Sequence, residues 1–134
     1  MKDFNDNNYC FACGRDNPQG IKLTFSYDDE TGETISTTVF SRYFQGWENI
    51  LHGGIISTVL DEIMVKAASF NGFKCVTAAL NVEFKNPAFI DKPYIIKGKV
   101  KGTRGKIVFT EGIIHDATAE NKIIATGTGK LFIL

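Results

Sequence analysis

The sequence lacks a net charge, a long apolar run and a leader-like start, and each absence argues against a class of function. Its 15 lysines and arginines balance 15 acidic residues, so no overall positive field favours nucleic acid. No apolar run approaches the roughly 20 residues that a membrane-spanning helix needs. The first residues, MKDFNDNN, have neither the basic start nor the apolar core of a signal peptide. These features predict a cytoplasmic protein with no nucleic-acid or membrane partner.

Cysteine is also scarce. Cys10 and Cys13 form a C-x-x-C motif, and Cys75 stands alone. A structural zinc site usually has four ligands, and the sequence has neither a second C-x-x-C motif nor a pair of neighbouring histidines. A metal shared between two chains and a redox pair are the alternatives, although a redox motif normally belongs to a βαβ unit and a strand follows here. We therefore expect reduced thiols and no metal.

Hydrophobic periodicity and turn residues predict one helix and six strands in a single domain, residues 1–134. The expected strands are 21–27, 33–40, 75–86, 94–103, 107–115 and 122–132, and the helix is 54–70. Apolar positions cover more than half of the helix circumference, so the helix should be wrapped by a sheet. Short connections between the later strands favour antiparallel pairing. The expected fold class is α+β.

One stretch of the predicted helix carries unusual chemistry. A His52-Gly53-Gly54 turn leads into it, and Asp61 follows among mostly apolar helical neighbours. A carboxylate in such surroundings is costly unless it is paired or takes part in chemistry, and a satisfied buried acid is the plain alternative. Glu62 points about 100° away and lies four residues before Lys66, which is typical of an exposed ion pair.

The spacing from His52-Gly53-Gly54 to Asp61 resembles the signature of PaaI-like (phenylacetyl-CoA thioesterase-like) hotdog-fold acyl-CoA thioesterases, of the 4-hydroxybenzoyl-CoA thioesterase superfamily. The loop QGWENILHGG and the segment VTAALNVEFKNPA are similar to the family's loop and strand on either side of the helix. The segment CFACGRDNPQGIKLTF looks like an N-terminal part common in this group. The resemblance therefore runs from about residue 10 to the end of the chain.

The resemblance implies a hotdog fold, a six-stranded antiparallel sheet around one central helix, with active sites at a homodimer interface. The assembly would be a homodimer or a dimer of dimers (a homotetramer). Geometry favours the same arrangement, because the eight residues from Gly53 to Asp61 span about 12 Å along a helix. A base and an oxyanion donor must each lie about 3 Å from the reacting atoms. The two groups should therefore come from different subunits.

The implied activity is hydrolysis of an acyl-CoA, with coenzyme A entering only as part of the substrate and no separate cofactor. Asp61 would act as general base or as nucleophile, and the Gly53 N–H would stabilise the oxyanion. Thr77 lies where relatives carry a catalytic Thr or Ser and would orient Asp61 or the water; a plain strand residue is the alternative. His52 would shape the loop or contact the carbonyl, and Gln45 is a candidate for positioning water.

Substrate binding would also draw on the basic segment that follows. Seven basic residues and one acid lie between residues 85 and 106, and the phosphates of coenzyme A would be attracted to them. Three alternating lysines of one strand suit a solvated face, whereas basic residues at strand ends suit ligand contacts. The predicted substrate-binding residues are Gln45, Gly54, Asn81, Lys85, Arg104 and Lys106, and plausible acyl-pocket walls are Phe44, Trp47, Ile56 and Phe84.

Two other functions remain open. A hotdog hydratase would pair the aspartate with a nearby histidine on one element, and no histidine follows Asp61 at such a spacing. A non-catalytic acyl-CoA-binding protein would keep the same pocket without turnover. The presence of Asp61 together with Thr77 favours the hydrolase.

Overall fold

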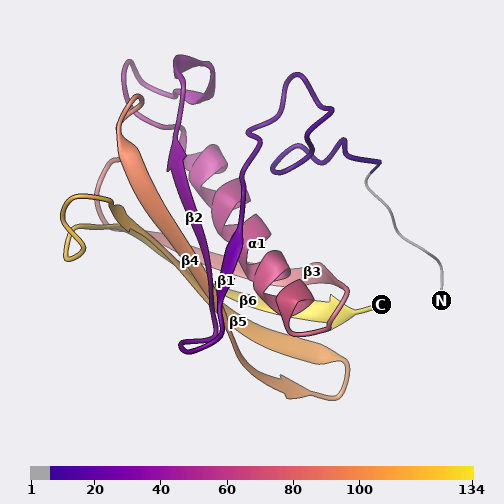
Figure 1. Cartoon of the computed structure of the whole chain (residues 1–134). Coiled ribbons are helices and arrows are strands. Elements are labelled where there is room, and N and C mark those ends of the chain that lie inside the picture. Colours follow the sequence, from indigo (N-terminus) through magenta and orange to yellow (C-terminus); the bar gives the residue numbers. More distant parts are fainter. Residues whose placement is uncertain (1–6) are drawn as a thin grey trace.

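The computed structural model describes residues 7–134, which form one antiparallel sheet and one long helix (Figure 1). The sheet order is β1-β2-β4-β5-β6-β3, and every neighbouring pair is antiparallel. The strands are β1 (Ser26–Asp28), β2 (Glu33–Val39), β3 (Cys75–Phe84), β4 (Pro93–Arg104), β5 (Ile107–Asp116) and β6 (Ile123–Ile133). A short 3-10 turn, η1 (Arg42–Phe44), precedes the helix α1 (Gly53–Phe70).

Helix α1 lies across one face of the curved sheet and contacts all strands from β2 to β6 (Figure 1). Its buried residues are Ile56, Val59, Leu60, Ile63, Met64, Ala67 and Ala68. Close approach depends on glycines in the sheet: a Cβ at Gly98 would lie 2.7 Å from the Ile63 carbonyl oxygen. A Cβ at Gly112 would lie 3.1 Å from a Leu60 methyl group. These glycines let the helix backbone rest on the strands, which fixes the position of Asp61 relative to the sheet.

The two edges of the sheet differ. Strand β1 has 3 residues, whereas β3 has 10 residues and, within the described chain, pairs only with β6. The side chains of Val76, Leu80 and Phe84 on β3 are 46%, 38% and 55% exposed. A long edge strand with exposed apolar side chains offers its free backbone groups to another strand.

The predicted α+β fold is confirmed, and most element boundaries agree within two residues. The expected strand over 21–27 is wrong for its first part, because only Ser26 and Tyr27 of it join β1. Lys22 has a φ of 59°, which interrupts an extended backbone. The amides of Ile21 and Leu23 donate instead to the carbonyls of Phe11 and Ala12, so this stretch is tied to the N-terminal segment rather than to the sheet.

The C-terminal stop of α1 follows the prediction. Asn71 caps the helix, and its side-chain amide donates to the Ala67 carbonyl at 2.8 Å. Gly72 continues with a φ of 88°, a conformation that glycine adopts without steric cost. Among the described residues, no helix combines the length and the apolarity that crossing a membrane would require.

Candidate active site

Asp61 lies on the side of α1 that faces the free edge of the sheet. The Thr77 hydroxyl of β3 donates to Asp61 Oδ1 at 2.5 Å, and this is the one hydrogen bond of the carboxylate within residues 7–134. Asp61 is half-buried and Thr77 is exposed. The carboxylate is therefore oriented by one donor, while its second oxygen remains available to water.

The first turn of α1 is capped by His52. Its Nδ1 accepts a hydrogen bond from the Gly54 N–H at 2.8 Å. The carbonyl of His52 accepts from the amides of Ile55 and Ile56. The Gly53 N–H has no partner within the described chain, and it lies at the positive end of the helix dipole. This amide is a candidate donor to a developing negative charge.

The predicted catalytic residues thus form two groups rather than one. Gly53 approaches the ring of Phe84, since a Cβ there would lie 3.6 Å from Phe84 Cε1, whereas Asp61 contacts Thr77 near the opposite end of β3. Both groups lie on the same helix, and eight residues of helical rise separate them by about 12 Å. Within one chain they cannot act on one carbonyl group.

A groove of about 900 Å³ lies beside the first turn of α1. Its lining comes from the N-terminal segment, the loop before α1, and α1 itself: Phe11, Pro18, Gln19, Gly20, Ser41, Tyr43, Phe44, Gln45, His52, Gly54, Ile55 and Thr58. Gln45 Oε1 accepts from the Asn49 amide at 3.1 Å, so its side-chain carbonyl is used to close the loop. Because the Gly54 N–H is occupied by His52, Gly54 can line this groove but cannot offer its amide to a ligand.

The four predicted walls of the acyl pocket lie in different environments. Phe44 lines the groove, and Phe84 contacts Gly53. Ile56 is 3% exposed and belongs to the hydrophobic core, so its prediction as a wall is wrong for the single chain. Trp47 is 84% exposed, which leaves it free of the core.

The basic residues occupy three places. Lys97 and Lys99 line a cavity of about 400 Å³ on the sheet, together with Asn81, Glu83 and Glu111. Asn81 therefore lies away from Asp61, among residues that alternate with those facing the helix.

Lys85 follows the C-terminal end of β3 and contacts Glu83 at 3.2 Å. The turn from Arg104 to Lys106 lies near the other end of β3, because the Lys106 carbonyl accepts from Ile133, the partner of Cys75. The predicted phosphate contacts are therefore at opposite ends of the edge strand.

Sequence reasoning missed one cluster. Cys10 Sγ lies 3.5 Å from Glu62 Oε2, and Cys13 Sγ lies 3.6 Å from Glu62 Oε1. Lys66 forms the expected pair with Glu62 at 3.9 Å, but the Glu62 side chain is only 16% exposed. Burial, the Glu62 charge and the neighbouring Cys10 raise the pKa of the Cys13 thiol to about 12. The C-x-x-C motif pointed to this place, but its contact with a helix residue some 50 positions later was not visible.

The antiparallel sheet wrapped on one central helix, with an acid on that helix and a long free edge strand beside it, defines the hotdog class of fold. A thioesterase-superfamily protein, RHA08564, superposes with a TM-score of 0.86 at 22% identity, covering 95% of this chain and 61% of that one. The E. coli PaaI protein from the phenylacetic acid degradation operon superposes with a TM-score of 0.74 at 19% identity, covering 84% and 83%.

The family follows from the sequence match. The model of the Thioesterase superfamily matches residues 48–122, so the chain belongs to that superfamily, as the resemblance predicted. The acyl-coenzyme A thioesterase THEM4 of Bos taurus is 25% identical over 123 residues, which are 92% of this chain and 50% of that protein. The chain spans about half the length of the curated relatives that it matches.

Proposed function

We propose that the protein hydrolyses acyl-CoA thioesters to a free acid and coenzyme A. The observation that carries the proposal is Asp61, a carboxylate oriented by Thr77 on an otherwise apolar helix beside a free strand edge. The matched superfamily and the THEM4 relative, an acyl-coenzyme A thioesterase by name, support the same reaction.

In this mechanism Asp61 acts as general base on a water molecule that attacks the thioester carbon. Thr77 holds one carboxylate oxygen, so the other can accept the proton of the water. The attack places negative charge on the carbonyl oxygen, and the Gly53 N–H donates to that oxyanion. The coenzyme A thiolate leaves and takes up a proton. Direct attack by the carboxylate, with an anhydride intermediate, is the variant in which Asp61 is the nucleophile.

Each site would combine Asp61 of one chain with Gly53 of a second copy. Strand β3 is the free edge, and its two ends lie beside the two groups: Thr77 beside Asp61, and Phe84 beside Gly53. Antiparallel pairing of two β3 strands about a two-fold axis midway between Thr77 and Phe84 brings opposite ends together. Asp61 of one copy then faces Gly53 of the other, and this happens twice in a symmetric dimer.

The same pairing would gather the basic residues. Lys85 and the Arg104 turn are at opposite ends of β3 in one chain, so they would flank one site when the second copy is present. Coenzyme A carries several phosphate charges, and such a rim would attract them. The groove lined by Phe11, Tyr43 and Phe44 begins beside the helix N-terminus and would receive an apolar part of the substrate.

The direct test is a panel of acyl-CoAs, short and long, aliphatic and aromatic, with released thiol as the readout. The expected result is turnover of at least one member. Binding of acyl-CoA without release of thiol would instead identify a non-catalytic acyl-CoA-binding protein. Neither binding nor turnover with any member of the panel would remove acyl-CoA from the proposal.

A further inference from the structure

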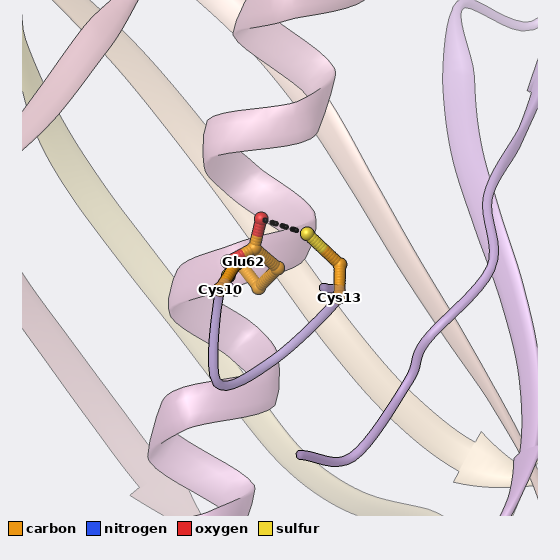
Figure 2. A group of neighbouring side chains, drawn as sticks. All are labelled: Cys10, Cys13 and Glu62. Carbon is orange, nitrogen blue, oxygen red and sulfur yellow. Dashed lines mark hydrogen bonds between the residues drawn. The ribbon is translucent and has the colours of Figure 1, made fainter. Parts of the chain in front are cut away.

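A second cluster of reactive side chains lies about 100° around α1 from the Thr77 contact, at Glu62. The Cys10–Cys13 turn of the N-terminal segment lies against the middle of the helix, and Figure 2 shows the Cys13 thiol pointing to the Glu62 carboxylate. The Cys10 thiol contacts the other oxygen of the same carboxylate. The ligand atoms of the three residues, one from each, lie within 4.8 Å of one another. The proposed hydrolysis uses none of these groups.

The turn that carries the two cysteines is tightly closed. The Gly14 amide donates to the Cys10 carbonyl at 2.8 Å, and a Cβ at Gly14 would lie 2.4 Å from the Cys10 nitrogen. Only glycine fits there, and the closed turn keeps both sulfur atoms on the side of the helix. Leu23 and Ile21 tie the following stretch to the same turn through backbone hydrogen bonds.

The spacing of the donor atoms suits a tetrahedral metal ion. Zn–S bonds of about 2.3 Å and Zn–O bonds of about 2.0 Å, at tetrahedral angles, separate a sulfur from an oxygen ligand by about 3.5 Å. The observed sulfur-to-oxygen distances are 3.5 Å from Cys10 to Glu62 Oε2 and 3.6 Å from Cys13 to Glu62 Oε1, so one oxygen must come within this distance of both sulfur atoms when an ion binds. Thiol-to-carboxylate hydrogen bonds have similar lengths. A measurement of bound metal therefore distinguishes a metal site from a pair of hydrogen bonds.

The charges around the cluster also balance with a divalent cation. Two thiolates and the Glu62 carboxylate carry three negative charges, which the cation and the Lys66 ammonium neutralise. Lys66 is 3.9 Å from Glu62 and 5.7 Å from the centre of the Phe25 ring. Its side chain can therefore withdraw toward the ring when a cation binds, because the ring face attracts its charge.

We propose that Cys10, Cys13 and Glu62 bind one thiophilic divalent cation of the zinc type, with water as the fourth ligand. Binding converts two thiols to thiolates and releases their two protons to solvent. The four-ligand rule that argued against zinc on sequence grounds counted only cysteines and histidines, and here a helix carboxylate supplies the third ligand.

Such a cation would fasten the N-terminal segment to α1. The same segment supplies Phe11 and Gln19 to the wall of the groove beside the helix N-terminus. The bound cation would therefore hold one wall of that groove in place and raise the free energy of unfolding, since a ligand that binds only the folded state stabilises it.

Metal content of the full chain tests the proposal. The protein is produced in zinc-supplemented medium and purified in reducing buffer, without a histidine tag or chelator, and zinc is measured by mass spectrometry. The expected content is about one zinc per chain. Titration of the stripped protein with Co²⁺ should produce thiolate-to-cobalt charge-transfer absorption, and Zn²⁺ should abolish it. The melting temperature should rise with Zn²⁺ and fall after chelation.

Variants assign the ligands. Cys10→Ser with Cys13→Ser should remove both the zinc and the absorption, whereas Glu62→Gln should keep the sulfur absorption but weaken Co²⁺ binding. Cys75→Ser is the matched control, because Cys75 is a half-buried thiol outside the cluster and its removal should change nothing.

Three results would overturn the proposal. One is metal-free wild-type protein that gives no cobalt absorption, or that forms a Cys10–Cys13 disulfide in reducing buffer. Another is unaltered Co²⁺ affinity in Glu62→Gln, which would remove Glu62 from the ligand set. The third is equal loss of metal in Cys75→Ser. If the double cysteine variant does not fold, the metal content of the wild-type protein and the Co²⁺ affinity of Glu62→Gln still test the proposal.

Discussion

Asp61 and Glu62 are neighbours on one helix, yet they face different parts of the molecule. Asp61 receives one hydroxyl donor, Thr77, at the free edge of the sheet. Glu62 lies about 100° around the helix, beneath the N-terminal segment, with two thiols and an ammonium around it. A carboxylate with one donor keeps an oxygen free for chemistry, whereas one surrounded by donors is held as a structural or metal-binding group.

The difference arises from what packs on each side of α1. On the side of Asp61 the sheet ends at β3, and within residues 7–134 the carboxylate is only half-buried. On the side of Glu62 the chain supplies a closed turn of its own, fixed by Gly14. Asp61 is therefore the carboxylate that stays partly accessible, and Glu62 is the one surrounded by groups of its own chain.

The largest expected effect comes from Asp61→Asn, which keeps the shape of the side chain and removes the base. Turnover of the best acyl-CoA should fall by about 10²- to 10⁴-fold. Asp29→Asn, an exposed acid in the turn before β2, is the matched control and should retain wild-type turnover. Thiol release under saturating substrate measures both. Undiminished turnover in a folded Asp61→Asn protein would remove Asp61 from the mechanism.

The orientation of Asp61 can be separated from its chemistry through Thr77. Thr77→Val removes the hydroxyl at nearly constant volume, while Thr77→Ser keeps it. A hydrogen bond to a charged group contributes about 1.5–3 kcal/mol, so the valine variant should lose about 10- to 100-fold in kcat. The serine variant should recover most of that loss. Equal rates for the two variants would mean that Thr77 is an ordinary strand residue.

A smaller effect is expected at the rim of the proposed site. Arg104→Ala should raise KM for acyl-CoA by a few-fold with little change in kcat, because an exposed charge contributes about 1 kcal/mol or less. For a truncated thioester without the nucleotide, the KM of Arg104→Ala should be almost equal to that of the wild-type protein. The same increase in KM for both thioesters would show that Arg104 does not recognise the phosphates.

The smallest effect concerns Asp116, a carboxylate whose partners lie within its own turn. The hydroxyl and the amide of Thr118 donate to Asp116 Oδ1, and they lower the pKa of this carboxyl below its usual value. A lowered folded-state pKa contributes stability above the unfolded pKa, and that contribution is lost as pH falls through the folded value. Asp116→Asn should therefore lower the melting temperature at neutral pH. The difference in melting temperature between the variant and the wild type should become smaller as the pH falls. A constant difference at all pH values would contradict this cause.

Most of the fold could be predicted because its signals are local. Alternating strands, the Asn71-Gly72 stop and the glycine turn at Gly32 are each determined by a few neighbouring residues. The segment 21–25 could not be predicted, because its amides pair with residues 11 and 12 rather than with a strand. An alternating sequence pattern predicts an extended backbone, but it does not show which segment that backbone will form hydrogen bonds with.

The roles assigned to the site residues stay predictions, and only their positions can be compared with the structure. The helix motif led to Asp61 and Gly53, and helical rise alone separated them by about 12 Å. The contacts of Glu62 with Cys10 and Cys13 were not predictable, since they join residues about 50 positions apart. The buried position of Ile56 was also missed, because a helix apolar over most of its circumference does not reveal which side faces the core.

The central claim is that Asp61 and Gly53 of different copies form one site, and mixed dimers test it most directly. Gly53→Pro removes the proposed oxyanion donor with little strain. Gly53 is the first residue of α1, where proline is favoured, and His52 before it is extended, with a ψ of 134°. Asp61→Asn removes the base from the other subunit. Each variant alone should be nearly inactive, because both sites of its homodimer lack one group.

After the two variants are mixed and subunit exchange is verified by mass, about half of the dimers contain one copy of each. One site of every mixed dimer combines both intact groups, so about a quarter of wild-type turnover should return, as two-fold symmetry requires. Both variants must first show the wild-type circular dichroism spectrum and assembly state. If exchange is complete and no turnover returns, the shared site between two copies is contradicted.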